Sequence, residues 1–178
     1  MAKQYLLVTI IGPDRRGIVA KITEIIVGHN ANIEESRMAR LGGEFAAILL
    51  LSISNQNKDG LLQSLGKIDY EKVHLFIKET DLSRIRVFEG FIPYQISIVG
   101  ADHMGIVHTV AEYLAEKHIQ VEEMETRVTP APVTGTPLMS MHAEIQVPPD
   151  IKLPELRENL FELGDKIGVD IEIRYPLN

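Results

Sequence analysis

One short phrase, Gly-x-Asp-x-x-Gly-Ile-Val, occurs twice in this 178-residue chain. It reads GPDRRGIV at residues 12–19 and GADHMGIV at residues 100–107. Each copy lies between an apolar, β-branched segment and a segment with helical spacing, so it predicts a turn from a strand into a helix. Free N–H groups and the positive end of the helix dipole favour a carboxylate or phosphate at such a turn. The repeated phrase therefore predicts a binding site for a small anion at one or both turns.

Two residue types within the turn carry this prediction. Asp14 and Asp102 stand where a helix N-cap is expected. Gly17 and Gly105 are expected just inside the helices, where glycine costs about 1 kcal/mol relative to alanine. Either the close approach of a ligand or tight packing of helix against strand could justify that cost. Nucleotide-binding loops match less well, because neither copy has the Gly-Lys-Ser/Thr of a phosphate loop or the Gly-x-Gly of a dinucleotide fingerprint.

The elements around the turns repeat as well. Residues 10–35 align with residues 98–123 without a gap, and nine aligned pairs are identical. Each copy has the order β-α-β-β-α-β, which is the ferredoxin-like plan of an antiparallel sheet with two helices on one face. The sequence therefore predicts an α+β protein with two ferredoxin-like domains in tandem, at residues 1–80 and 92–178, joined by a linker at 81–91. The apolar helix positions are Ile18, Ile22, Ile25, Ile26, Leu61, Leu62, Leu65 and Ile68 in the first copy, and Ile106, Val110, Tyr113, Leu114, Leu153, Leu156, Leu160 and Leu163 in the second.

Composition limits the classes of function. Hydrophobic residues make up 45% of the chain and charged residues 24%, which is typical of a globular protein that buries a core. The chain has no cysteine, which excludes disulfides, thiolate metal sites and cysteine nucleophiles. The apolar run at residues 5–11 is too short for a signal peptide or a membrane span. We therefore expect a cytoplasmic protein without a membrane partner.

The charge balance argues against direct binding to nucleic acid. The formal net charge is −7. Residues 1–86 hold 12 Lys and Arg against 10 Asp and Glu, whereas residues 87–178 hold 6 against 15. Because Lys and Arg carry most of the affinity for phosphates, the second half is a poor match for DNA, and the first half shows no basic stripe.

From about Lys3 to Tyr175 the chain resembles a tandem pair of ACT domains, the small-molecule-sensing modules of many amino-acid biosynthetic enzymes. The phrases GPDRRGIVAKIT and GADHMGIVHTVA are most similar to the form found in glycine cleavage system transcriptional repressors and at the head of formyltetrahydrofolate deformylases. The resemblance implies that an amino acid binds where two units pack edge to edge. It would touch the strand-to-helix turn of one unit and the start of the second strand of its neighbour.

The resemblance also implies which residues bind the ligand. Backbone N–H groups near Arg16 and Gly17 would hold the α-carboxylate, while Asp14 and the side-chain oxygen of Asn32 would receive the ammonium. The full set is Gly12, Asp14, Arg15, Arg16, Gly17, Ile18 and Asn32 in the first copy, and Gly100, Asp102, His103, Met104, Gly105, Ile106 and Gln120 in the second.

The two predicted sites are not equal. Arg15-Arg16 in the first turn is replaced by His103-Met104 in the second, so the turns differ in charge. The first turn is therefore the better candidate for a ligand with an acid group, and the second is either a further site or a degenerate one.

The function implied by the resemblance is regulatory and not catalytic. We expect a protein that senses a small amino acid, with glycine or serine favoured, and that regulates a transcription factor or a metabolic enzyme, as a homodimer of four ACT units. No catalytic residue, metal or cofactor is expected. The alternatives are a folate deformylase, whose catalytic domain would need more chain than follows the second unit, and a module whose repeats serve only in oligomerisation.

Two other features have structural interpretations. The pairs Glu34-Glu35 and Glu122-Glu123 recur in register, but adjacent strand residues point to opposite faces and cannot converge on one ion. We expect them to protect an edge strand from aggregation. The second copy also carries a six-residue insertion, in the segment TPAPVTGTP at residues 129–137. Its prolines predict an exposed loop that does not extend a sheet ladder, and it could serve as a docking arm or a lid.

Overall fold

The computed structural model describes residues 3–68, 72–81 and 90–176. The chain divides into two compact units, which we call unit 1 (Met1–Arg86) and unit 2 (Val87–Asn178). Each has its own hydrophobic core. The predicted linker at 81–91 lies mostly outside the described residues.

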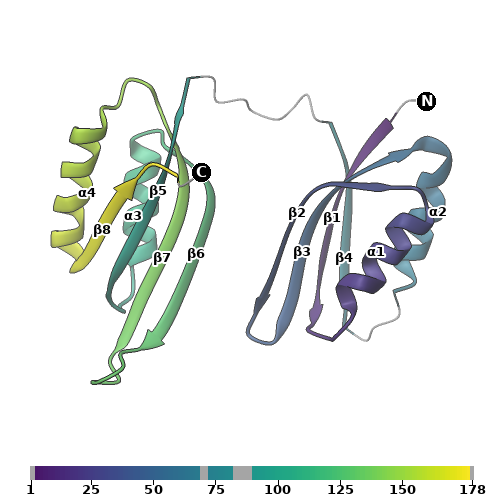
Figure 1. Ribbon diagram of the computed structural model, residues 1–178, viewed down its shortest axis with the longest axis horizontal. Helices are drawn as coiled ribbons and strands as arrows, with labels where there is room; N and C mark the ends of the chain where they lie inside the picture. The colour runs from purple at the N-terminus through teal and green to yellow at the C-terminus, as the bar shows by residue number, and fades with distance from the viewer. Residues whose placement is uncertain (1–2, 69–71, 82–89, 177–178) are drawn as a thin grey trace. The chain divides into compact units, whose positions relative to one another are not determined.

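Unit 1 contains four strands and two helices in the order β-α-β-β-α-β (Figure 1). They are β1 (Lys3–Pro13), α1 (Ile18–Gly28), β2 (Asn32–Leu41), β3 (Glu44–Ser54), α2 (Asn55–Gly66) and β4 (His74–Thr80). The strands form one antiparallel sheet in the order β2-β3-β1-β4, with β1 between β3 and β4.

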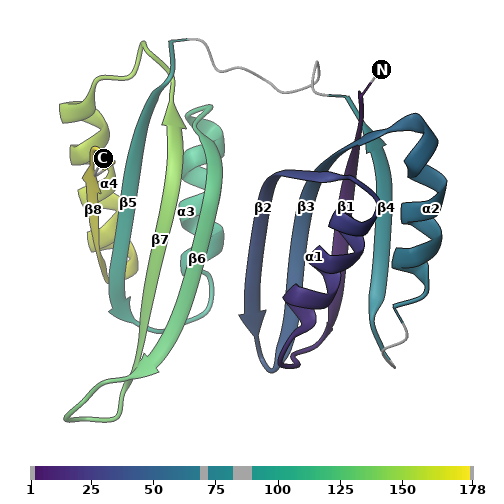
Figure 2. The same ribbon diagram turned by 45° about the vertical axis from the view of Figure 1, so that its right-hand side comes forward.

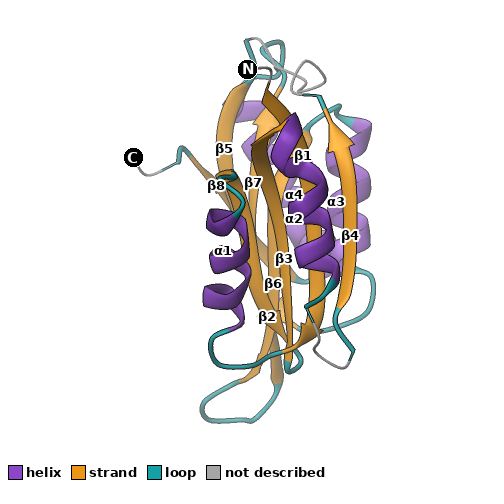
Figure 3. Cartoon of the chain, turned by 90° about the vertical axis from the view of Figure 1, so that its right-hand side faces the viewer, coloured by secondary structure: helices purple, strands orange, loops and turns teal. Residues whose placement is uncertain are grey.

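Unit 2 repeats this arrangement. Its elements are β5 (Ile92–Ala101), α3 (Ile106–Glu116), β6 (Gln120–Pro130), β7 (Pro137–Val147), α4 (Leu153–Ile167) and β8 (Val169–Arg174). The sheet order is β6-β7-β5-β8, which matches that of unit 1 strand for strand. In both units the two helices cover the same face of the sheet (Figures 1 and 3). The predicted pair of ferredoxin-like domains is confirmed.

Alternation along the strands explains why each core forms on one face of its sheet. In β1 the side chains of Leu6, Val8 and Ile10 are fully buried against the helices, while the residues between them point to the other face. The helices contribute Ile18, Ile22 and Ile26 in α1, and the corresponding Ile106, Val110 and Leu114 in α3, all of them buried. These are residues that the helical spacing predicts.

A β-bulge interrupts the edge strand at the same place in each unit. The register between β2 and β3 shifts between Ile33 and Glu35, and that between β6 and β7 shifts between Val121 and Glu123. Because β2 and β6 are the outermost strands of their sheets, both glutamate pairs lie on edge strands, as predicted. Glu34 is not simply a solvated charge, because its carboxylate accepts a hydrogen bond of 2.5 Å from the Oγ of buried Ser52.

The proline-containing insertion extends the sheet further than predicted. The β6–β7 ladder continues to the pair Pro130 and Pro137, so the loop itself is only residues 131–136. The prediction that this segment cannot extend a ladder is wrong, because the two prolines stand opposite each other at the end of the hairpin. Figure 2 shows this hairpin projecting beyond the other strands of unit 2. Val133, in its loop, is almost fully exposed.

In the part of the chain that the structure describes, no helix is long and apolar enough to cross a membrane.

The strand-to-helix turns as candidate sites

The second glycine of each repeated phrase has a left-handed backbone. Gly17 has φ of 84° and Gly105 has φ of 98°, and each is the N-cap residue of the helix that follows. The prediction that they lie inside the helices is therefore wrong. Neither close packing nor ligand approach is needed to explain them, because only glycine adopts this conformation without strain. A Cβ added at either position would meet none of the described atoms within 4 Å.

The first glycine of each phrase, in contrast, is required by packing. A Cβ at Gly12 would lie 2.9 Å from Cγ2 of Val73, and a Cβ at Gly100 would lie 2.7 Å from Cγ1 of Val169. Val73 directly precedes β4, and Val169 is the first residue of β8. The tight packing considered for the second glycine is thus found at the first one, against the residue at or just before the start of the last strand.

Asp14 and Asp102 are not N-caps, because Gly17 and Gly105 take that position and no side-chain hydrogen bond caps either helix among the described residues. The Asp14 backbone N–H donates to the carbonyl oxygen of Gly43, at 3.0 Å, which ties the turn to the β2–β3 hairpin. Its carboxylate accepts a hydrogen bond of 3.4 Å from Nη1 of Arg40 near the end of β2. The corresponding Asp102 N–H donates to the carbonyl oxygen of Pro137 at 2.9 Å.

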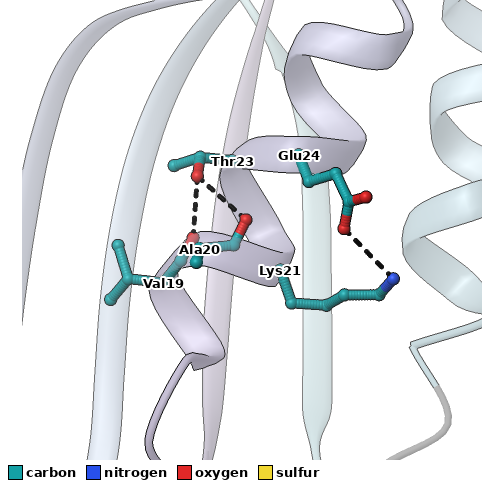
Figure 4. A network of polar contacts seen from close by, with 5 residues as sticks. All are labelled: Val19, Ala20, Lys21, Thr23 and Glu24. Carbon is teal, nitrogen blue, oxygen red and sulfur yellow. Dashed lines mark hydrogen bonds and ion pairs between the residues drawn. The ribbon is translucent and has the colours of Figure 1, made fainter.

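Among the described residues, no side chain accepts a capping hydrogen bond from the N–H groups at the start of α1. Thr23 turns its hydroxyl back along the helix and donates to the carbonyl oxygens of Val19 and Ala20, both at 3.0 Å (Figure 4). Lys21 pairs with Glu24, at 3.2 Å. The first turn of α1 contains no acidic residue. The positive end of this helix is therefore not neutralised by a side chain of its own first turn.

His103 connects the second turn to the far end of α4. Its Nδ1 lies 3.0 Å from the carbonyl oxygen of Met104, and its Nε2 lies 2.8 Å from that of Ile167, the last residue of α4. Only the protonated ring has an N–H at both nitrogens and can donate to both carbonyl oxygens. These two hydrogen bonds therefore raise the pKa of His103 above its ordinary value.

The two turns therefore differ in structure as well as in sequence. Arg15, Arg16 and Asp14 are exposed at the first turn, and Arg40 adds a further positive charge beside Asp14. At the second turn the exposed Met104 replaces an arginine, and the place of Arg40 in β2 corresponds to Val128 in β6. The sequence alone did not indicate Arg40 as a residue of the site, because its position beside Asp14 depends on the register of the β2–β3 hairpin.

Within one unit, Asn32 lies far from the turn. Both Asn32 and Tyr5 stand opposite Ser52, so Asn32 is level with Tyr5, nine residues before Asp14 along β1. Nine strand residues span about 30 Å. Asn32 also donates a side-chain hydrogen bond to Glu34, which together with the bond from Ser52 lowers the pKa of that carboxylate.

Gln120 occupies the equivalent place in unit 2. It stands opposite Gln146, which pairs with Pro93, nine residues before Asp102. Its amide donates to the carbonyl oxygen of Val121 at 2.9 Å. Neither unit by itself brings the two parts of the predicted ligand set together.

Comparison with known proteins gives the family. The ACT domain matches residues 4–72. The glycine cleavage system transcriptional repressor of Escherichia coli is 30% identical over 132 residues, which are 73% of this chain and 68% of the repressor. An unknown protein of Galdieria sulphuraria has a crystal structure with a TM-score of 0.79 and 29% identity, covering 99% of this chain and 100% of its own.

A second solved structure, of a candidate glycine cleavage system transcriptional repressor, aligns with a TM-score of 0.71 over the full length of both chains. Its identity of 19% supports the fold alone. The domain match, the tandem fold and the extent of the E. coli alignment agree. The chain belongs to the glycine cleavage system transcriptional repressor family of ACT-domain proteins.

Proposed function

We propose that this chain is a non-catalytic regulatory protein that binds a free amino acid, with glycine or serine favoured, where two of its ACT units meet. Occupancy of that site would be transmitted to a protein partner, and a transcription factor of glycine metabolism is the partner that we favour. Membership of a family named for a transcriptional repressor supports this proposal.

One observation carries the proposal. The two parts of the predicted ligand set, Asp14 and Asn32, lie at opposite ends of the sheet within a unit. A ligand that contacts both parts must therefore bridge two units, with the turn of one beside the start of the second strand of the other. Because such a ligand binds only the paired arrangement, its binding free energy stabilises that arrangement. This coupling is what a sensor requires.

The chemistry of the first turn suits an amino-acid zwitterion. The uncapped N-terminus of α1, with Arg15, Arg16 and Arg40 nearby, favours the carboxylate. The carboxylate of Asp14 and the amide oxygen of Asn32 from a neighbouring unit would accept hydrogen bonds from the ammonium. A small side chain suits a site in which these groups stand close together, which is why glycine and serine are favoured.

The test is calorimetric titration of the purified protein with a panel of free amino acids. We expect one small amino acid to bind, Asp14→Ala to abolish binding at the first turn, and Asp102→Ala to show whether the second turn contributes. Asp59→Ala, which removes an exposed carboxylate from α2, is the matched control and should leave binding unchanged. Absence of binding by every amino acid in the panel would overturn the proposal.

Complementation tests whether the site spans two chains. If Asp14 of one chain and Asn32 of another form the site, Asp14→Ala and Asn32→Ala proteins should each fail to bind. Mixing the two should restore binding, because a mixed dimer contains one site with both residues intact. If Asp14→Ala abolishes binding and the mixture does not restore it, Asn32 of another copy of unit 1 is not part of the site, and Gln120 is the next residue to test.

The nature of the partner needs a separate measurement. Affinity purification from the native cell, with and without the bound amino acid, should recover a transcription factor whose association depends on the ligand. Recovery of a metabolic enzyme would instead identify a detached regulatory subunit. Deformylase turnover by the purified chain would contradict a non-catalytic role.

A further inference from the structure

The sheet of unit 1 has an apolar surface on the face that its helices do not cover. We call this surface the open face of unit 1, and it consists of Leu7 and Ile11 on β1, Ile48 and Leu50 on β3, and Phe76 on β4. Phe76 is 78% exposed, Ile48 is 48% exposed and Ile11 is 45% exposed. An exposed phenylalanine beside four branched aliphatic side chains is typical of an interaction surface.

Unit 2 supplies an internal comparison for this surface. Its sheet has the same strand order and pairing, so the corresponding positions can be read from the register. The counterparts of Leu7, Ile48, Leu50 and Phe76 are the polar residues Gln95, His142, Glu144 and Glu172. The counterpart of Ile11 is Val99, which is also apolar.

The open face of unit 2 is correspondingly more polar, although exposed Val99 remains on it. It forms a shallow groove of about 250 Å³ whose lining includes Gln95, Ser97, His142 and Glu144. Ser97 and His142 lie in hydrogen-bond contact at 3.2 Å. The same strand order thus occurs with polar residues at four of these five positions, so the fold itself does not dictate the apolar side chains of unit 1.

Charges flank the apolar centre of unit 1 in a particular order. The register places Glu35, Leu50, Leu7 and Lys78 in one row across the four strands, with the acid on edge strand β2 and the base on edge strand β4. The next row is Arg37, Ile48, Thr9 and Phe76. Each row has complementary groups at its two ends, a carboxylate with an ammonium in one and a guanidinium with an aromatic ring in the other.

We propose that the open face of unit 1 binds the same face of a second copy of this chain, about a two-fold axis parallel to the strands. This rotation places β2 of one copy over β4 of the other while it keeps each row level with itself. Glu35 of each copy then faces Lys78 of the other, and Arg37 of each copy faces the ring of Phe76 of the other. The contacts occur twice, as the symmetry of such a dimer requires.

The pairing is favourable in several respects. Apolar side chains from both sheets pack between the charged ends, in the way that two sheets pack face to face about 10 Å apart. Arginine over an aromatic ring adds a cation–π contact. Within one copy Glu35 already lies 3.6 Å from Arg37, so the second copy adds a cation to a carboxylate that is held in place.

The size of the face is close to the lower limit for a specific dimer. Four strands about 4.8 Å apart and roughly seven residues long give a flat footprint on the order of 450 Å² per copy. The two copies together thus approach the lower limit of about 1,000 Å² for a specific interface. We therefore expect a dimer whose population depends on protein concentration and not a permanent one. The proposal does not depend on the amino-acid site.

Sedimentation velocity over a range of concentrations, without any amino acid, is the first experiment. The unmodified chain should show a concentration-dependent change from monomer to dimer. Phe76→Glu, which introduces the residue that unit 2 has at this position, should weaken the dimer by about tenfold or more. Phe161→Glu on α4 is the matched control, because this phenylalanine is also exposed, at 63%, but lies away from both open faces. Circular dichroism should show that both variants stay folded.

Charge reversal then tests the two-fold arrangement itself. Glu35→Lys and Lys78→Glu should each weaken the dimer, because each sets like charges against each other twice. An equimolar mixture of the two variants should form a mixed dimer with affinity close to that of the unmodified chain, since both facing pairs are again of opposite sign. Glu123→Lys and Arg174→Glu, at the corresponding ends of the row in unit 2, should leave the dimer unchanged.

Three outcomes would overturn the proposal. The unmodified chain could remain monomeric at every concentration, which would leave the face for a different protein. Phe76→Glu could sediment as the same dimer as the unmodified chain, which would place the contact elsewhere. The mixture of charge variants could fail to associate, which would exclude this two-fold axis. None of these outcomes bears on whether an amino acid binds.

Discussion

The Nε2 atom of His103 lies 2.8 Å from the carbonyl oxygen of Ile167, so the turn at the start of α3 is joined to the last residue of α4. The Nδ1 atom of the same ring lies 3.0 Å from the carbonyl oxygen of Met104. A neutral imidazole has one N–H and can donate only one of these bonds, whereas the imidazolium donates both. The positive charge also suits the C-terminal end of α4, where the helix dipole is negative.

This arrangement predicts that unit 2 loses stability as the pH rises. The carbonyls of Met104 and Ile167 raise the pKa of His103 in the folded state above the ordinary value of 6.5. The stabilisation is therefore complete below pH 6.5 and is lost as the pH rises through the folded-state pKa. Thermal unfolding from pH 5 to pH 9 should show this loss, and His103→Ala should flatten the profile. An NMR titration of the His103 ring that gave a pKa below 6.5 would contradict the prediction.

The contact between Ser52 and Glu34 predicts that unit 1 loses stability as the pH falls, the opposite of the pH dependence predicted for His103. Hydrogen bonds from Ser52 and Asn32 and the charge of Lys3 hold the pKa of Glu34 below its ordinary value of 4.5. The resulting stability is present above pH 4.5 and is lost as the pH falls through the folded-state pKa. Ser52→Ala should therefore lower the melting temperature at pH 7, and the difference from the unmodified chain should shrink on acidification. Glu122→Gln serves as a control, because unit 2 has Gln146 in place of Ser52.

Substitution of three glycines by alanine should change the free energy of unfolding in different directions. Gly100→Ala should cost about 1–3 kcal/mol, because the new Cβ would lie 2.7 Å from Val169 and 3.0 Å from the carbonyl oxygen of Gly168. Gly17→Ala should cost about 1–2 kcal/mol through its φ of 84°, although its surroundings are open. Gly28→Ala, in the last turn of α1 and without a close neighbour, should stabilise the chain by about 0.5 kcal/mol. Urea unfolding measures all three.

Because each unit has its own core, we expect a core substitution in one unit to leave the stability of the other unchanged. Ile22 is 1% exposed in the core of unit 1, so Ile22→Ala should destabilise that unit by about 2–5 kcal/mol. Hydrogen exchange resolved by peptide should then rise in α1 and in β1 and β3, while α3, β5 and β7 keep their protection. Equal loss of protection in both units would show that they unfold as one cooperative body.

Much of the fold could be predicted from local patterns. The order β-α-β-β-α-β follows from apolar alternation in strands and from helical spacing at residues such as Ile18, Ile22 and Ile26, and the structure confirms it. The repeated phrase also indicated the ACT family, which the comparisons confirm. These properties depend on neighbouring residues along the chain, so a single sequence contains them.

The details of the turns could not be predicted in the same way. Asp14 follows a strand and precedes a helix, which is the ordinary place for an N-cap, yet its carboxylate faces Arg40, twenty-six residues away. That contact depends on the β2–β3 hairpin, and the backbone angle of Gly17 depends on how the turn closes. The amino acid, its contacts and the partner remain predictions, because they involve groups outside a single unit.

The bulges in β2 and β6 restrict how the sheet of each unit can be extended. Their shifts, between Ile33 and Glu35 and between Val121 and Glu123, are at equivalent positions. A bulge leaves one residue of the edge strand outside the ladder, so no further strand can pair evenly along β2 or β6 at that position. The open faces differ in contrast, with Phe76 in unit 1 where unit 2 has Glu172. Both units thus limit growth of the sheet at the same edge, while their open faces offer different chemistry to a partner.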